Sequence, residues 1–246
     1  MSITVTFVGS GDSFGSGGRF NTCILVDAPG IRFCIDFGAS SLIALERLGI
    51  PHNTIDTILL THLHGDHCGG VPFLLVDAML AAKRDRPLTI AGPPSTTERL
   101  KLVAAAMMPG MEVMVPKFPI SYLDLPVLRG TEIGPLKLMT YPAVHTKETH
   151  PTSLRVEVAG KVIAYTGDSE WTEHMPELAD AADLFIAECY FFRKAVRFHL
   201  NYPEIVKHRA EIRAKRLVLT HLGREMLANL DKLPEECAHD GHSIRL

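Results

Sequence analysis

The sequence predicts a layered α/β fold in which residues 1–246 form one domain. Strand-like apolar runs come in groups, helical patterns lie between them, and nothing repeats at a fixed short period. No low-complexity linker divides the chain, and a chain of this length can bury one sizeable core. A single compact α/β domain is the simplest interpretation of these observations.

The first part of the chain alternates strands with helices. Apolar patterning predicts strands at 3–8, 22–26, 31–36, 55–60 and 88–91. A glycine-dense loop follows the first of them, and Pro29-Gly30 provides the turn between the second and third. Helices are predicted at 41–48, 72–83 and 95–107. A proline in the first turn favours the second helix, and Ser95 is the expected N-cap of the third.

The second half is expected to contain more strands. Residues 111–142 alternate apolar and polar side chains between Pro and Gly breaks, which indicates several short strands. A hairpin is predicted from 152–158 and 161–165, with Ala159-Gly160 at its turn. Helices are then expected at 171–182 and 201–215, and buried strands at 183–189 and 216–220. The last of these is predicted to be the final strand.

Composition excludes some classes of function. The chain is 46% hydrophobic and 22% charged with a net charge of -3, which is typical of a soluble globular protein and gives no basic stripe for a nucleic acid. A small phosphorylated substrate stays compatible with this charge, because a metal centre supplies local positive charge. The N-terminus lacks a signal-peptide pattern, and no apolar run approaches the roughly 18 residues of a membrane span. We therefore expect a cytoplasmic protein without a membrane partner.

The strongest chemical signal is the segment Thr61-His-Leu-His-Gly-Asp-His67, which directly follows a predicted buried strand. It contains three imidazoles and one carboxylate: His62, His64, Asp66 and His67. Imidazole and carboxylate together suit zinc, iron or manganese. On a turn, His62 and His64 would hold one metal while Asp66 and His67 hold its neighbour.

Three later segments end strand-like runs with further ligand-type residues. They provide His145, Asp168 and His221. Strand ends are rigid positions from which a fold can preorganise a site, and a carboxylate such as Asp168 has two oxygens with which to bridge two cations. The sequence therefore predicts a binuclear metal site.

In this order, HLHGDH, His145, TGDS and LTHL resemble the motifs of the metallo-β-lactamase superfamily along essentially the whole chain. The resemblance implies a four-layer αββα sandwich of two mixed sheets flanked by helices. It also implies two divalent ions, with zinc expected and manganese or iron as alternatives. His62, His64 and His145 would hold the first ion, Asp66, His67 and His221 the second, and Asp168 would bridge them. Asp36 stands where the family keeps a carboxylate that orients a ligand imidazole.

A downstream pair resembles the ribonuclease Z branch of this superfamily. There a glutamate ending a strand and a histidine in the next loop transfer a proton, and Glu188 and His199 match them. The alternative is a structural role, with Glu188 as a buried ion-pair partner and His199 as a helix-start residue. Asp66, Glu188 and His199 are thus the expected catalytic residues, with Asp66 also a metal ligand. The glycine-rich opening VGSGDSFGSGG also resembles that branch.

One departure from the branch bears on the substrate. Members that process transfer RNA carry a long arm between the third histidine motif and the aspartate motif. Here the interval from His145 to Asp168 is only 23 positions (168 − 145), and one hairpin fills it. This disfavours RNA and favours a phosphodiesterase acting on small or cyclic phosphate esters. A thioester or lactone hydrolase, or a ribonuclease Z-like endonuclease, stays open as an alternative.

The sequence leaves other features undecided. The aromatic residues Tyr190, Phe191, Phe192 and Phe198 are compatible with a pocket wall or with a subunit contact. Homodimers are common in the branch, so a homodimer is expected by analogy alone. The natural substrate and the metal loaded in the cell are not determined by these motifs.

Overall fold

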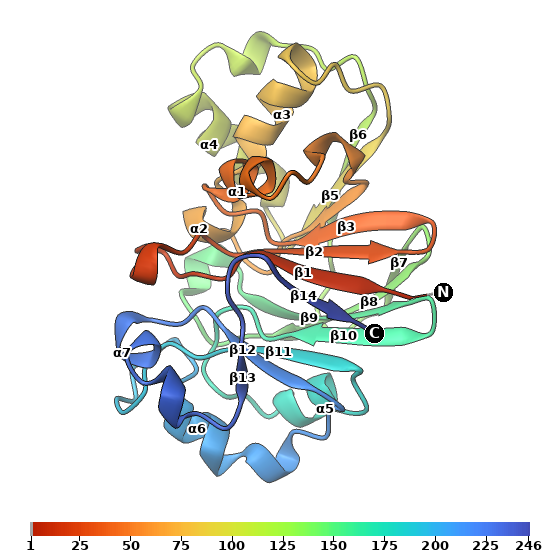
Figure 1. Ribbon diagram of the computed structural model, residues 1–246. Helices are drawn as coiled ribbons and strands as arrows, with labels where there is room; N and C mark the ends of the chain where they lie inside the picture. The colour runs from red at the N-terminus through yellow and green to blue at the C-terminus, as the bar shows by residue number, and fades with distance from the viewer. Residues whose placement is uncertain (1) are drawn as a thin grey trace.

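Two mixed seven-stranded sheets form the centre of the computed structural model, which describes residues 2–246 (Figure 1). The first sheet contains β1 (Thr4–Gly9), β2 (Cys23–Ala28), β3 (Ile31–Ile35), β4 (Thr57–Leu59), β5 (Leu88–Gly92), β6 (Ile120–Asp124) and β14 (His242–Arg245). Their order is β14-β1-β2-β3-β4-β5-β6. Pairing is antiparallel from β14 to β3 and parallel from β3 to β6.

The second sheet also combines antiparallel and parallel strand pairs. It contains β7 (Thr131–Ile133), β8 (Leu136–Pro142), β9 (Thr152–Val158), β10 (Lys161–Tyr165), β11 (Leu184–Glu188), β12 (Leu217–Thr220) and β13 (Glu236–Cys237). Their order is β13-β12-β11-β10-β9-β8-β7. Pairing is antiparallel from β7 to β10 and parallel from β10 to β13.

Helices cover the outer faces of both sheets (Figure 1). α1 (Ser41–Arg47), α3 (Val71–Leu80) and α4 (Thr96–Met107) cover the first sheet, and α2 (Gly65–Cys68) lies at its edge. α5 (Met175–Ala179), α6 (Tyr202–Lys207) and α7 (Arg224–Leu227) belong to the second half. Short 3₁₀ turns complete the chain: η1 (Ser16–Gly18), η2 (His52–Thr54), η3 (Met111–Val113), η4 (Lys147–Thr149), η5 (Arg209–Glu211) and η6 (Leu230–Lys232).

Three apolar clusters separate the layers. One contains side chains of both sheets, such as Phe33 and Tyr165, and it is the centre of the sandwich. A second joins the first sheet to its helices, and a third joins the second sheet to α5 and α6. The expected αββα sandwich of two mixed sheets is confirmed, because each sheet buries one face against the other sheet and one against helices.

Some predicted elements differ in extent. The helix expected at 171–182 is only α5, and Trp171 instead stacks flat on His208 with ring centroids 4.2 Å apart. The helix expected at 201–215 ends at Lys207 and continues as the η5 turn. Ser95 precedes α4, but its left-handed backbone (φ 69°) leaves its side chain without a capping hydrogen bond.

The expectation that the strand at 216–220 is the last one was wrong. β13 and β14 follow it, and β14 returns to pair with β1 at the edge of the first sheet. Its partner is distant in sequence, so local patterning gave no sign of this pairing.

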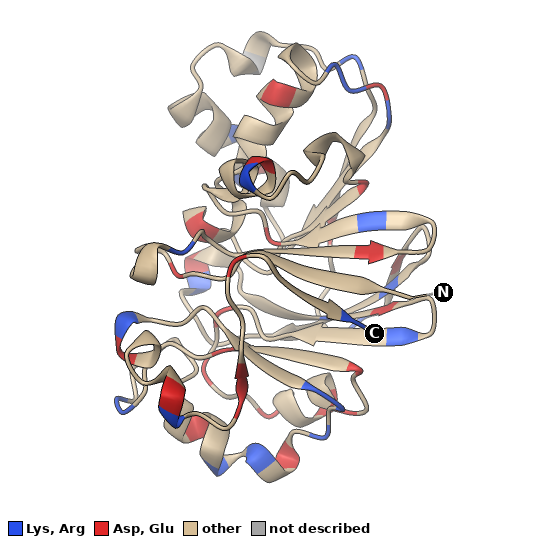
Figure 2. Cartoon of the chain, viewed as in Figure 1, with Lys and Arg blue, Asp and Glu red and all other residues tan. Residues whose placement is uncertain are grey.

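Parallel strands end together at one edge of the sandwich, on the left of Figure 1 near α2 and α7, whereas both chain termini lie on the right. Parallel sheets collect functional loops at the carboxyl ends of their strands. Figure 2 shows acidic and basic residues dispersed over both halves in this view. Within residues 2–246, no helix has the length and apolar character that crossing a membrane requires.

Candidate metal centre

Three histidines from two distant segments converge at this edge. His62 and His64 follow β4, and His145 lies three residues beyond the end of β8. The Nδ1 atom of His64 lies 3.2 Å from Nε2 of His62 and 3.0 Å from Nε2 of His145. His62 is fully buried and His145 nearly so. The three ring nitrogens therefore enclose a position for one ion.

A second group of four side chains lies beside the first. Asp66 and His67 are on α2, rather than on the turn expected from the sequence, and Asp168 and His221 follow β10 and β12. Oδ2 of Asp66 lies 3.3 Å from Nε2 of both His67 and His221. Asp168 contributes Oδ1, 3.3 Å from Nε2 of His67, and Oδ2, 3.5 Å from Nε2 of His221.

Asp168 is the residue shared by the two groups. Its Oδ2 atom lies 4.0 Å from Nε2 of His145 as well as 3.5 Å from Nε2 of His221. The carboxylate thus faces both enclosed positions, as a bridging ligand must.

The donor set fits divalent ions of the zinc type. Ligands about 2.0–2.1 Å from a tetrahedral zinc ion lie roughly 3.3 Å from one another, which matches the separations in both groups. Two of the converging atoms, Nε2 of His67 and Oδ1 of Asp168, are buried and have no hydrogen-bond partner. Buried polar atoms are rarely left unpaired, so these two point to a ligand at the centre.

Asp36 fixes the orientation of one of these rings. It is fully buried, and it accepts hydrogen bonds from the backbone N–H of Thr61 (2.8 Å) and from Nδ1 of His67 (2.7 Å). Holding the proton of His67 on Nδ1 leaves the Nε2 lone pair free for a metal. Asp36 thus occupies the position that the sequence predicted, and Thr61 Oγ1 donates to the same carboxylate at 2.8 Å.

Burial and neighbouring charges shift the pKa values of several side chains in the cluster in opposite directions. Burial brings the pKa of His62 well below its ordinary value, so its ring is neutral and able to act as a ligand. Burial also raises the pKa of Asp36, although His67 opposes this effect. The pKa of Asp66 lies below its ordinary value, because His67 and His221 outweigh the effect of burial.

Glu188 and His199 meet beside this cluster. Oε2 of Glu188 lies 3.0 Å from Nδ1 of His199, and that nitrogen is 3.9 Å from Oδ2 of Asp168. The second oxygen of Glu188 accepts from the backbone N–H of Ser169 (2.6 Å) and Leu200 (3.2 Å). Asn201, two residues later, is the N-cap residue of α6, so His199 does not start the helix.

The two members of this pair differ in exposure. Glu188 is completely buried, and burial followed by repulsion from Asp168 raises its pKa well above the ordinary value. The His199 side chain is 22% exposed, and burial lowers its pKa although Asp168 opposes the effect. Since Nδ1 faces Glu188, Nε2 is the His199 nitrogen available to an incoming molecule.

The sequence did not identify the residues that hold the loop before His199. The backbone N–H of Phe198 donates to Oε1 of Glu170 at 2.7 Å, and its carbonyl accepts from Nδ1 of His145 at 2.7 Å. Glu170 lies two positions after Asp168, and this adjacency was the available signal. These contacts tie the loop directly to the first histidine group.

Two residues at the centre have left-handed backbones. Asp36 has φ of 58° and His221 has φ of 57°, a region that non-glycine residues rarely adopt. Such strain concentrates at functional sites, where the surrounding structure enforces it. Both directly follow strands, β3 and β12, so the bend turns each side chain toward the centre.

Known proteins resemble the chain over nearly its full length. It is 26% identical over 282 residues to a ribonuclease Z of Agathobacter rectalis, covering 95% of this chain and 92% of that one. It is 25% identical over 237 residues to the anti-Pycsar protein Apyc1 of Bacillus phage 010DV004, covering 91% and 90%.

A solved structure shares the fold. The metallo-beta-lactamase fold protein YhfI from Bacillus subtilis superimposes with a TM-score of 0.81 at 20% identity, covering 100% of this chain and 99% of that chain. The family model described as anti-Pycsar protein Apyc1 matches residues 3–236. The match contains the whole candidate centre and every strand from β1 to β12, and the chain belongs to the anti-Pycsar protein Apyc1 family, within the ribonuclease Z-like branch of the metallo-β-lactamase fold.

Proposed function

We propose that the protein is a binuclear metal-dependent phosphodiesterase that hydrolyses small or cyclic phosphate esters. In this proposal His62, His64 and His145 hold one divalent ion, Asp66, His67 and His221 hold the other, and Asp168 bridges them. The separations of the donor atoms and the two unpaired buried atoms support this assignment. Zinc is the expected metal, because imidazole and carboxylate ligands at tetrahedral spacing suit it.

The contact between Glu188 and His199 is the observation that carries the phosphodiester assignment. Two bound ions would activate a water and neutralise negative charge on the phosphoryl oxygens, but they would not protonate a leaving alkoxide. Glu188 holds Nδ1 of His199, which leaves Nε2 to deliver a proton to the departing oxygen. Thioester and lactone hydrolysis needs no such donor for a good leaving group.

A small substrate is favoured by the segment between His145 and Asp168. It consists of the η4 turn and the β9–β10 hairpin, and both strands are paired within the second sheet. Within residues 2–246, no arm extends from this interval to grip an RNA. The net charge of -3 also gives little general attraction to a polyanion.

Hydrolysis of bis-p-nitrophenyl phosphate by metal-quantified protein tests the proposal. The same preparation is assayed with a thioester, a lactone and a precursor transfer RNA. We expect phosphodiester turnover that chelator abolishes and that scales with occupancy up to two ions per chain. Turnover of the carbon esters alone would make Glu188 and His199 structural, and efficient cleavage of the RNA would refute the small-substrate assignment.

A further inference from the structure

The backbone of Phe198 lies between a candidate metal ligand and the candidate proton donor. Its carbonyl oxygen accepts a hydrogen bond from Nδ1 of His145 at 2.7 Å, and the next residue in the chain is His199. Holding the proton of His145 on Nδ1 leaves its Nε2 lone pair free for an ion, as Asp36 does for His67. A displacement of Phe198 would therefore move a ligand ring and the donor ring together.

Phe198 needs its surroundings to hold it in this position. Its backbone is left-handed, with φ of 71°, a conformation that a bulky residue without help rarely adopts. The Phe198 residue is 38% exposed, so its ring is not locked inside a core. Such strain persists only where neighbouring contacts over-determine the backbone, so the contacts of the Phe198 peptide groups matter.

Glu170 provides one of these contacts. The backbone N–H of Phe198 donates to Oε1 of Glu170 at 2.7 Å. A hydrogen bond to a carboxylate is stronger than one between neutral groups, so this is a firm anchor for a loop residue. On the far side of His199, the Asn201 side chain donates from Nδ2 to the carbonyl oxygens of Val196 (3.1 Å) and His199 (2.9 Å).

The contacts around Glu170 form a closed ring. The backbone N–H of Glu170 donates to the carbonyl oxygen of Val144 at 3.0 Å, and the backbone N–H of Val144 donates to Oγ of Ser169 at 2.9 Å. Val144 directly precedes His145, which returns to the Phe198 carbonyl. Because the ring is closed, each contact limits the movement of the others, and the Glu170 side chain is the link that reaches the loop.

We propose that Glu170 is a positioning residue that holds the Phe198 backbone so that His145 faces its ion and His199 faces the substrate. The part that concerns His199 rests on the proposed function, whereas the part that concerns His145 does not depend on the substrate. Glu170 acts through Phe198, and the position of its oxygen, rather than its charge, is what the loop requires.

Three substitutions separate position from charge. Glu170→Gln keeps an oxygen acceptor in place without the charge, Glu170→Asp keeps the charge but withdraws the carboxylate by one methylene, and Glu170→Ala removes both. We expect Glu170→Gln to resemble the parent and Glu170→Asp to resemble Glu170→Ala. An electrostatic role at the metal centre predicts the reverse order. The two conservative variants decide the question even if Glu170→Ala does not fold.

The first measurement is zinc affinity, determined on the zinc-loaded protein by competition with a fluorescent chelator and without substrate. Glu170→Ala and Glu170→Asp should bind one of the two ions roughly 10- to 30-fold more weakly, in the lower part of the range for outer partners of metal ligands. Glu170→Gln should stay within about threefold of the parent, because it keeps the hydrogen bond. Glu173→Ala is the matched control, since it removes an exposed carboxylate from the same loop.

The second measurement is turnover at saturating zinc, which separates the effect on His199 from loss of metal. For diesters with poor leaving groups, kcat of Glu170→Ala should fall roughly tenfold while KM stays within about twofold, because proton donation is impaired and binding is not. Nitrophenyl diesters need little proton donation, so their kcat should fall much less. A merely structural role would lower kcat equally for both kinds of ester.

The outcomes distinguish this inference from the proposed function. If Glu170→Ala and Glu170→Asp bind zinc as tightly as Glu173→Ala, or if Glu170→Gln loses as much as they do, the role toward His145 is refuted even when the parent hydrolyses phosphodiesters. Equal losses along the leaving-group series would overturn the role toward His199. If the parent hydrolyses no phosphodiester and yet the zinc affinities follow the expected order, the proposed function fails and the role toward His145 stands.

Discussion

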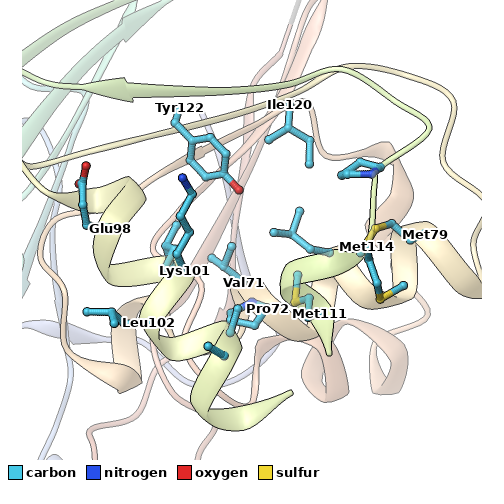
Figure 3. Close-up of a pocket in the computed structure, with 15 residues that line it drawn as sticks. Val71, Pro72, Met79, Glu98, Lys101, Leu102, Met111, Met114, Ile120 and Tyr122 are labelled. Carbon is cyan, nitrogen blue, oxygen red and sulfur yellow. The ribbon is translucent and has the colours of Figure 1, made fainter. Parts of the chain in front are cut away.

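The candidate centre and the apolar cavity between α3, α4 and β6 differ in the kind of side chain that forms them. At the centre, buried polar atoms converge, and Nε2 of His67 and Oδ1 of Asp168 have no partner. The apolar cavity has a volume of about 740 Å³, and Pro72, Met79 and Tyr122 are among its lining residues (Figure 3). Lys101 and Glu98, both on α4, also belong to its lining (Figure 3).

This difference indicates which residues determine the chemistry of the protein and which determine its stability. Positions at the centre are fixed by particular atoms, so an exchange of one ligand type for another removes the site. Around the apolar cavity, volume and hydrophobicity are the only requirements, so conservative changes preserve the structure. We therefore expect substitutions at the centre to change chemistry and substitutions around the cavity to change stability.

Asp168→Ala should give the largest effect. Removing the shared carboxylate should lower turnover by at least about 10³-fold, since metal-based charge stabilisation supplies several kcal/mol. Metal content measured on the purified variant should fall as well. A fully metallated, active variant would refute the bridging assignment.

His199→Ala should give the second-largest loss of activity. Loss of a general acid costs about 10²- to 10⁴-fold for diesters with poor leaving groups and much less for nitrophenyl esters. The comparison is a series of diesters with leaving groups of increasing pKa. Equal losses along the series would show that His199 positions the substrate instead.

Asp36→Asn should be milder, because Asp36 acts through His67. We expect metal affinity or activity to fall roughly 10- to 100-fold. Competition with a fluorescent chelator measures the affinity, and added metal should restore part of the activity. No recovery at saturating metal would mean that Asp36 has a role beyond holding the ligand ring.

Leu75→Ala tests the apolar cavity between α3, α4 and β6. Leu75 is nearly buried and lines the apolar cavity, so its truncation should reduce the free energy of unfolding by about 2 kcal/mol, the low end for such changes, because space is already present. Denaturant titration measures this loss. Activity per bound metal should not change, and a matching loss of turnover would show that the two regions are coupled.

Asp183→Asn should have the smallest effect. Asp183 also differs from the carboxylates of the candidate centre in the groups that offset its negative charge. Burial by itself would raise the pKa of Asp183, but its partners Lys215, Lys161 and the backbone N–H of Val162 together outweigh that effect and lower the pKa to about 2. The depressed pKa means that its stabilisation is complete above about pH 4 and is lost as pH falls toward 2. The Tm difference between the parent and Asp183→Asn should shrink over that interval, and a difference independent of pH would refute this origin.

Dense local motifs made much of the centre predictable. Three imidazoles and a carboxylate within His62 to His67 have few structural uses, and the strand ends before Asp168 and His221 were visible as apolar runs. The mixed αββα sandwich followed from the same motifs through resemblance. Helix lengths were less predictable, because Trp171, which lies before α5, stacks on His208, which directly follows α6, and this tertiary contact joins residues that were both expected inside helices.

The sequence by itself determined which residue types are available and that they follow buried strands. Only the tertiary structure decided which of them meet. The hydrogen bond of Glu188 to His199, the support of Phe198 by Glu170 and the joining of the η1 loop to Tyr190 across α7 all link segments from different strands. Such contacts depend on the pairing and packing of whole sheets, which local patterns do not encode, because one-residue changes in register redirect every side chain.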